Sequence, residues 1–406
     1  MSVFPKKFLW GAATSSHQVE GLNTLNDWWD WEEKGNVKER SGKACNHYEL
    51  FPQDFELAKR LNHNAHRFSI EWSRIEPKDN CWDENALKHY REVVVALKER
   101  DLEPIATLHH FTNPLWFFQQ GGWLNKKASY YFHRYVGRVI DFLGKDVRYW
   151  ITINEPVVFA YHSYLMGKWP PGHTSLKSTF RVLSNLATAH RNAYETIHEK
   201  YAKQGWLHPL VSIAKNAEVF SPCPAFPWVL NHLPVFLRHQ IYNKYFFKKV
   251  HGYLDFIGLN YYTREVVRCS LKKADILFGE NCNSYHRHCK TLNYMGWSVS
   301  PEGLFEILHW LKRYKLPILI TENGTCDDDD SRRAHYIKGH LQQIERALQC
   351  SIPIFGYLYW SLLDNFEWDN GFGPRFGLID VDYATFKRTI RQSALEYKDY
   401  IVLQKG

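Results

Sequence analysis

Two glutamates stand at the ends of apolar segments that are far apart in the chain. Glu155 closes the segment Tyr149–Glu155 (YWITINE), and Glu322 lies at the end of Leu316–Asn323 (LPILITEN). If both side chains faced one pocket, one carboxylic acid could protonate the leaving oxygen of a glycosidic bond. The other could attack the anomeric carbon or activate a water molecule. The spacing therefore favours carboxylate-pair chemistry on a sugar.

The two carboxyl groups would need different protonation states, and therefore different surroundings. Glu155 follows Asn154, a neutral neighbour, whereas Glu322 would need a cation nearby to stay ionised. Arg67, in the segment HRFSIEWSRI, is the expected cation, and Tyr262 could donate a hydrogen bond to the same carboxylate. We expect Glu322 to be charged and Glu155 to hold the proton.

The elements that would position these residues are eight short apolar runs, each ending in polar or aromatic residues. They are Phe8–Ser16, Ala65–Trp72, Pro104–His110, Tyr149–Glu155, Leu210–Asn216, Asp255–Tyr262, Leu316–Asn323 and Phe355–Ser361. Near-continuous apolar strands indicate a parallel sheet that is buried on both faces. Alternating with helical stretches, they predict a single (β/α)8 TIM barrel over residues 1–406, with its active site at the carboxyl ends of the strands. An open doubly wound sheet is the alternative, but no glycine-rich phosphate fingerprint follows any run.

Helical periodicity fills the intervals between these runs. Apolar residues repeat at helical spacing after Asp83, an expected N-cap, and again over 132–143. Another stripe follows Ser300 and Pro301, which predict a helix start. A fourth covers 337–348, after the acidic run Asp327–Asp330.

Composition and charge argue against several other classes of protein. Of 406 residues, 45% are hydrophobic and 23% charged, which is typical of a globular protein. The net charge of +8 is spread along the chain, so no nucleic-acid partner is expected. No apolar run reaches the ~18 residues of a membrane span. No secretory signal is seen, and the eight cysteines lack a CxxC pair, so a cytoplasmic protein without a disulfide scaffold is expected.

Several longer motifs resemble glycoside hydrolase family 1, the β-glucosidase and β-glycosidase family, almost from end to end. They are FLWGAATSSHQVEG at 8–21, HRFSIEWSRIEP at 66–77, ITINEP at 151–156, LDFIGLNYYT at 254–263, MGWSVSPEGL at 295–304, LPILITENG at 316–324, YWSLLDNFEW at 359–368 and RFGLIDVDY at 375–383.

The resemblance implies a retaining β-glycosidase acting on terminal glucosyl residues, and also on galactosyl or fucosyl residues. Glu322 would be the nucleophile and Glu155 the acid and then the base, with carboxyl groups ~5–5.5 Å apart. Asn154 would hold the sugar 2-hydroxyl. The resemblance also implies sugar contacts for Gln18, His110, Glu367 and Trp368, a platform at Trp360 and a leaving-group contact at Trp297. The partner would be a small β-glycoside or oligosaccharide, and no cofactor is implied.

Departures from the family pattern leave alternatives open. Phe111 stands where the family usually has tryptophan, and the connections over 220–254 and 263–295 are short, which predicts a more open entrance. A non-catalytic sugar-binding relative remains an alternative. A phospho-β-glycosidase is disfavoured, because Glu367 and Phe376 stand where such enzymes carry phosphate-binding residues, and a carboxylate would repel the phosphate.

Other chemistry-bearing residues are given plainer interpretations. Cys282, His286, His288 and Cys289 could suggest zinc, but their spacing matches no standard site and a surface loop is favoured. No metal site is therefore expected. Glu71 is interpreted as a structural ion pair with Arg67 and Arg74, and Trp28, Trp29 and Trp31 as residues of the site's rim. The oligomeric state is left undetermined.

Overall fold

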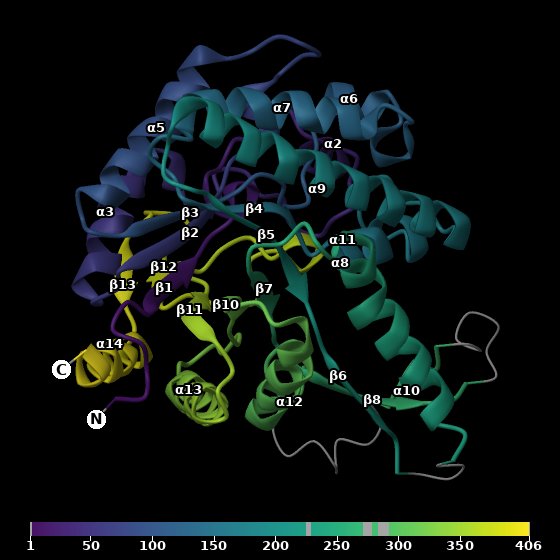
Figure 1. The fold of residues 1–406 in the computed structure, drawn as a ribbon, viewed down its shortest axis with the longest axis vertical. Coiled ribbons are helices and arrows are strands. Elements are labelled where there is room, and N and C mark those ends of the chain that lie inside the picture. Colours follow the sequence, from purple (N-terminus) through teal and green to yellow (C-terminus); the bar gives the residue numbers. More distant parts are fainter. Residues whose placement is uncertain (1, 225–228, 271–277, 283–291, 406) are drawn as a thin grey trace.

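A closed barrel of eight parallel strands forms the centre of the molecule (Figure 1). The computed structural model describes residues 2–224, 229–270, 278–282 and 292–405. The barrel strands are β1 (Leu9–Ala13), β2 (Ala65–Ser69), β3 (Glu103–Thr107), β4 (Tyr149–Asn154), β5 (Leu210–Asn216), β7 (Ile257–Asn260), β10 (Ile318–Asn323) and β11 (Ile354–Trp360). Each falls within or overlaps one of the predicted apolar runs, and β1 closes the ring against β11. The predicted (β/α)8 fold is confirmed.

The barrel interior is filled by its own small hydrophobic cluster. Its members come from nearly every strand: Ala65, Ile105, Ile151, Ala214, Phe256, Leu319 and Leu358. All seven side chains are fully buried. Such a layer makes the barrel a packed core rather than a pore. Because these side chains fill the barrel interior, a site can form only at an end of the barrel, and the carboxyl ends of the strands are the expected place.

Helices surround the barrel and connect its strands. Figure 1 shows α5, α7 and α9 along one side, with α12, α13 and α14 along the other. The helices are α1 (Ser16–Val19), α2 (Asp27–Glu33), α3 (His47–Arg60), α4 (Trp72–Ile75), α5 (Glu84–Lys98), α6 (Leu115–Gln119), α7 (Ala128–Leu143), α8 (Pro156–Ala160), α9 (Leu176–Gln204), α10 (His232–Arg238), α11 (Phe246–Val250), α12 (Pro301–Leu311), α13 (Arg333–Gln349) and α14 (Gln392–Lys405). Short 3-10 or π segments are η1 (Gly122–Leu124), η2 (Tyr161–Leu165), η3 (His239–Tyr245), η5 (Lys312–Tyr314) and η6 (Trp368–Asn370).

Two of the predicted helix starts use their side chains differently. Asp83 caps α5, and its carboxylate accepts from the N–H groups of Asn85 and Ala86. Ser300 precedes α12 as predicted, but its side chain makes no cap hydrogen bond and accepts from Arg264 instead. The cap at Ser300 was therefore predicted at the right place with the wrong contact.

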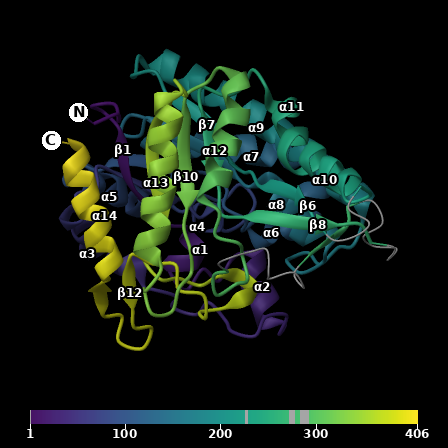
Figure 2. The same ribbon diagram turned by 90° about the horizontal axis from the view of Figure 1, so that it is seen from below.

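A three-stranded sheet lies outside the barrel, beside α10 (Figures 1 and 2). It consists of β6 (Val219–Pro222), β8 (Arg264–Arg268) and β9 (Glu280–Asn281), in the order β6-β8-β9. β6 follows the end of β5 and β8 follows the end of β7, so this sheet is an extension of the barrel's site edge. The sequence did not predict it. A further hairpin pairs β12 (Ile379–Val381) with β13 (Arg388–Ile390).

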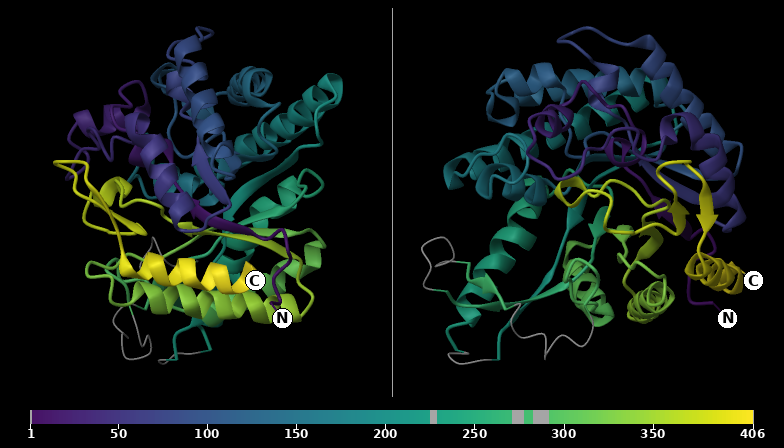
Figure 3. Two further views of the ribbon diagram at one scale, coloured as in Figure 1. Left: turned by 90° about the vertical axis from the view of Figure 1, so that its left-hand side faces the viewer. Right: turned by 180° about the vertical axis from the view of Figure 1, so that it is seen from behind.

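The two ends of the described chain lie side by side near α14 (Figure 3). Ser2 Oγ donates to the side chain of Gln404 at 2.8 Å, and Lys405 donates to the backbone of Asn62. Among the helices in the described ranges, none combines the length and the apolar character needed to cross a bilayer.

Candidate active site

Glu322 lies near the end of β10 and is only 3% exposed. Arg67 reaches it from β2, and its Nη1 donates to Glu322 Oε1 at 2.5 Å. The Tyr262 hydroxyl, just beyond β7, donates to the other carboxylate oxygen at 2.6 Å. Burial raises the pKa of Glu322, whereas Arg67 and Tyr262 oppose that rise because both contacts favour the charged form. The two contacts expected for this carboxylate are present.

Glu155 occupies the turn between β4 and α8, where its backbone is left-handed with φ +42°. The Glu155 N–H donates to the carbonyl of Ala214 in β5 at 2.7 Å, which holds the turn against the barrel. Asn260 Nδ2 donates to Glu155 Oε1 at 2.7 Å. Burial and the neighbouring Glu322 charge raise the pKa of Glu155 to about 8. At neutral pH Glu155 therefore carries a proton.

Asn154 connects the two carboxyl groups through a short set of hydrogen bonds. Its Oδ1 accepts from Arg67 Nη2 at 2.7 Å and from Asn260 Nδ2 at 3.2 Å. Its Nδ2 lies 3.2 Å from His110 Nε2. Burial and the Arg67 charge keep the pKa of His110 well below its usual value, so this ring is neutral and its Nε2 accepts the hydrogen bond.

Gln18 and Glu367 form a second polar group, whose carboxyl group is close enough to feel the charges of Glu322 and Glu155. Gln18 comes from α1, and its Nε2 donates to Glu367 Oε2 at 3.2 Å and to the carbonyl of Phe366 at 2.9 Å. Ser15 Oγ donates to Gln18 Oε1 at 2.6 Å and fixes the amide's orientation. Burial, followed by the Glu322 charge, raises the pKa of Glu367 to about 8.

Aromatic rings line the site on the His110 side. Trp360, at the end of β11, stacks on His110 with ring centroids 5.8 Å apart and planes 16° apart. Trp368 lies 6.2 Å from the same imidazole at 15°. Phe111, at the position where the family that the sequence resembles usually has tryptophan, packs edge-on against Trp368 at 5.2 Å.

A second aromatic group surrounds the Tyr262 ring. Trp297 lies 5.6 Å from Tyr262, and Phe376 lies 6.0 Å from Trp297. Trp360 and Phe376 share one buried apolar cluster, and Tyr262 and Trp297 pack against it. These contacts bring together predicted site residues that are far apart in the sequence.

Two polar residues of the site had no predicted role. Asn260 ends an apolar run, but nothing in the sequence shows that its amide bridges Asn154 and Glu155. Lys215 is fully buried in β5, with its ammonium 4.8 Å from the Tyr242 ring centroid. Burial lowers the pKa of Lys215 to about 7, and its charge lowers the pKa of Glu155. The available signal was that this lysine is the one charged residue in β5.

The interpretation of Glu71 as an ion pair with Arg67 and Arg74 was wrong. Arg67 and Arg74 pair with other carboxylates, and Glu71 accepts instead from the hydroxyls of Ser16, Ser73 and Thr112. Three hydroxyl donors therefore satisfy this fully buried carboxylate without a cation.

Trp28 was expected at the rim and is fully buried. It packs on Trp368 at 4.8 Å and on Trp169 at 5.6 Å, so it supports the site from behind. Trp29 and Trp31 are half-buried.

The possible metal ligands can be placed only in part. Cys282 is described, whereas His286, His288 and Cys289 lie outside the described residues. Within the described ranges, no group of three or more His, Cys, Asp or Glu side chains is arranged to hold a metal ion.

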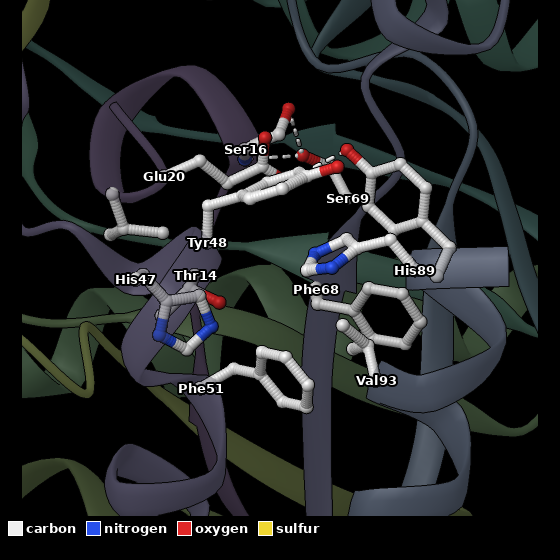
Figure 4. Close-up of a pocket in the computed structure, with 12 residues that line it drawn as sticks. Thr14, Ser16, Glu20, His47, Tyr48, Phe51, Phe68, Ser69, His89 and Val93 are labelled. Carbon is white, nitrogen blue, oxygen red and sulfur yellow. Dashed lines mark hydrogen bonds between the residues drawn. The ribbon is translucent and has the colours of Figure 1, made fainter. Parts of the chain in front are cut away.

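The pocket in Figure 4 is separate from the carboxylate pair. It is lined by Glu20, Tyr48 and His89 among others, between α3 and α5. Tyr48 stacks on His89 at 3.6 Å, and Glu20 accepts from Tyr90 at 2.7 Å. Its polar groups are used in internal contacts, so it is not the candidate site.

Two buried carboxyl groups of unequal proton affinity, held among aromatic rings where barrel strands end, are equipped to hydrolyse a glycosidic bond. The chain is a glycoside hydrolase of the (β/α)8 class.

Comparisons with known proteins identify the family. The profile of Glycosyl hydrolase family 1 matches residues 1–227 and 236–406, and the chain belongs to that family. It is 33% identical to β-glucosidase A of Thermotoga maritima over 446 residues, covering 98% of this chain and 97% of the relative.

Solved structures agree. The β-glycosidase from Pyrococcus horikoshii aligns with a TM-score of 0.92 at 38% identity, covering 100% of this chain and 96% of that one. A Thermotoga maritima β-glucosidase, solved in complex with deoxynojirimycin and with galacto-hydroximolactam, aligns at 0.89 and 30% identity, with both chains fully covered.

Proposed function

We propose that this β-glycosidase works with retention, through a covalent glycosyl-enzyme intermediate, with Glu322 as nucleophile and Glu155 as acid and base. The observation that carries the proposal is the unequal environment of the two carboxyl groups. Glu322 has a guanidinium and a phenol on its two oxygens, which favour the nucleophilic carboxylate. Glu155 has a neutral amide donor and a pKa of about 8, which favours the protonated acid.

In the first step, Glu322 attacks the anomeric carbon while the Glu155 proton passes to the departing glycosidic oxygen. The bond to the leaving group breaks as the ester to Glu322 forms. In the second step, Glu155 takes a proton from water, the water oxygen attacks the anomeric carbon, and Glu322 leaves as a carboxylate.

Charge coupling between the two glutamates matches this sequence of steps. The negative charge of Glu322 is the second largest cause of the raised pKa of Glu155. Ester formation removes that charge, so the pKa of Glu155 falls in the intermediate. Glu155 is therefore an acid when it must give a proton and a base when it must take one.

The remaining residues would bind the sugar. Asn154 would hold the 2-hydroxyl, since Arg67 and Asn260 fix its carbonyl oxygen and leave its amide group directed away from them. Gln18, His110, Glu367 and Trp368 would bind the other hydroxyls, with Trp360 as the platform beneath the ring and Trp297 on the leaving-group side. Phe376 would pack behind Trp297.

Terminal non-reducing β-D-glucosyl groups are the first proposed substrates, with galactosyl and fucosyl groups next. The T. maritima structure solved with galacto-hydroximolactam supports a site of this family that admits the galacto configuration. The site at Glu367, buried beside Gln18, disfavours a 6-phosphorylated sugar, because burial and the Glu322 charge already raise the pKa of Glu367 and a further negative charge would be unfavourable there.

The proposal treats residues 1–406 as one catalytic domain that needs no metal or cofactor and has a small β-glycoside or oligosaccharide as its partner. It assigns the enzyme to the cytoplasm, following the sequence-based expectation. The alternative, a non-catalytic sugar-binding relative, is disfavoured because both carboxyl groups are present in different electrostatic surroundings.

A trapping experiment tests the proposal. A 2-fluoro-β-glucoside with a good leaving group should inactivate the enzyme, and peptide mapping should locate the sugar on Glu322. Glu155→Ala should cleave aryl glycosides slowly, with azide restoring turnover and yielding the β-glycosyl azide. A label on another residue, or an α-configured azide product, would refute the retaining assignment.

A further inference from the structure

Two cysteines terminate the outer strands of the three-stranded sheet beside the site. Cys223 directly follows β6, and Cys282 directly follows β9. β8 lies between these strands, and both cysteines bond to it. Cys223 N–H donates to the Val267 carbonyl at 2.8 Å, and Cys282 N–H donates to the Val266 carbonyl at 2.7 Å. The backbone thus brings both residues to one end of the sheet.

Their sulfur atoms meet there. The Sγ atoms lie 2.6 Å apart, and Cys223 and Cys282 are 0% and 6% exposed. The sulfurs are about 0.6 Å farther apart than in a disulfide bond, so a small further approach of the two side chains would join them. Cys269 directly follows β8 at the same sheet, and Asn231 accepts from its N–H while donating to the Cys223 carbonyl, but the sulfur contact is between Cys223 and Cys282. Cys81 and Cys350 are exposed.

We propose that Cys223 and Cys282 form an intramolecular disulfide that ties β6 to β9 across β8. The proposal rests on this geometry and is independent of the catalytic assignment. It differs from the expectation drawn from cysteine spacing, because the two residues are separated by 59 positions and only the sheet brings them together.

The bond forms by exchange with an external disulfide, such as oxidised glutathione or a protein disulfide. The thiolate of one cysteine attacks that disulfide and releases one external thiol. The second cysteine then attacks the mixed disulfide and releases the other. The two cysteines lose two electrons and two protons in total, and the external disulfide is reduced to two thiols.

Burial determines when this exchange occurs and how long its product lasts. Both sulfurs are reached by an external disulfide before the sheet has closed, as the chain folds. Once closed, the sheet shields the bond from small thiols, which makes it a persistent structural disulfide. This protection allows it to exist in a compartment where exposed cysteines stay reduced.

The bond would stabilise the wall of the site that follows β5 and β7. β8 begins two residues after Tyr262, whose hydroxyl contacts Glu322. Thr263, between them, donates to the Ser298 carbonyl at 3.0 Å, next to Trp297. Closing a long loop chiefly limits the unfolded chain, so the main effect is on stability rather than on turnover.

Peptide mapping without reductant tests the bond directly. The purified enzyme, incubated with oxidised glutathione during refolding, is denatured with N-ethylmaleimide at acidic pH and digested. We expect one cross-linked species with the mass of the Cys223 and Cys282 peptides less two hydrogens. Complete alkylation of both residues would overturn the proposal, as would their release as thiols only when a chelator removes a bound metal.

Variants test what the bond does. Unfolding and refolding in dithiothreitol, which exposes the shielded bond to the reductant, should lower the Tm of the wild-type enzyme by about 2–8 °C and leave that of Cys223→Ser/Cys282→Ser unchanged. The wild-type and the matched control Cys350→Ser, at an exposed cysteine, should respond alike. The difference between oxidised and reduced forms is the informative readout, because serine at a buried site lowers stability by itself. Equal effects of reductant on the wild type and the double variant would refute the proposal.

Discussion

Replacing Tyr262 by phenylalanine removes one oxygen and leaves the ring that Trp297 packs against. The lost group donates to Glu322 Oε2 at 2.6 Å, and hydrogen bonds to charged groups contribute about 1.5–3 kcal/mol. One pKa unit corresponds to about 1.4 kcal/mol, so Tyr262→Phe should raise the pKa of Glu322 by about 1–2 units. The nucleophile must be ionised, and the acidic limb of kcat/KM should move to higher pH by the same amount.

The assay uses 2,4-dinitrophenyl β-glucoside, whose leaving group needs no proton. Titration of Glu155 then has little effect on the first step, and the acidic limb reports Glu322. Tyr261→Phe is the matched control, because that neighbouring hydroxyl donates to the Ser300 carbonyl at 2.7 Å, away from the carboxylates. An acidic limb that is the same in Tyr262→Phe and the wild type would refute the claim that Tyr262 stabilises the charged nucleophile.

Three other perturbations follow from the same structure. For p-nitrophenyl β-glucoside, kcat/KM should fall as pH rises through about 8, because Glu155 must carry its proton and its pKa is about 8. Glu155→Gln should remove this limb and slow alkyl glucosides by about 10²–10⁴-fold. Lys215→Met should move the limb upward only slightly, because the Lys215 charge lowers the pKa of Glu155 but the pKa of Lys215 is about 7, so most of this lysine is uncharged at pH 8. The exposed Lys338→Met should leave the limb in place, and a large upward movement in Lys215→Met would contradict the lowered pKa of Lys215. Ile151→Ala, in the filled barrel interior, should lower the free energy of unfolding by about 2–5 kcal/mol in urea titrations, and a loss of activity without a loss of stability would contradict its structural role.

The barrel could be predicted because each of its strands is buried on both faces. Burial forces an almost continuous apolar run, such as Leu316–Asn323, and that signal survives without knowledge of neighbours. The strand ends then limit where polar residues can meet. Arg67, Tyr262 and Glu322 were therefore expected together, and their hydrogen bonds are present.

Strand pairs and side-chain partners that depend on the tertiary structure could not be predicted from the sequence. β6 and β8 are short and half-exposed, so neither shows a strong period, and Val219 pairs with Arg264 across a long stretch of chain. The same limit explains Glu71. Two arginines lie within a few residues of it, but side-chain direction decides the partner, and three hydroxyls take the place of a cation.

The order of the strands in the barrel explains why Glu155 and Glu322 have different hydrogen-bond donors. Glu155 follows β4, whose neighbours in the sheet are β3 and β5, and the donor that reaches its carboxyl is an amide from β7. Glu322 is on β10, and the guanidinium that reaches it extends from β2 across the open end of the barrel. Because the same guanidinium also holds Asn154, one residue both favours the charged form of Glu322 and orients the amide expected at the 2-hydroxyl. In the mechanism we propose, exchanging the two glutamates' roles would require moving Arg67 to another strand, so strand order would determine which carboxyl group attacks and which gives up its proton.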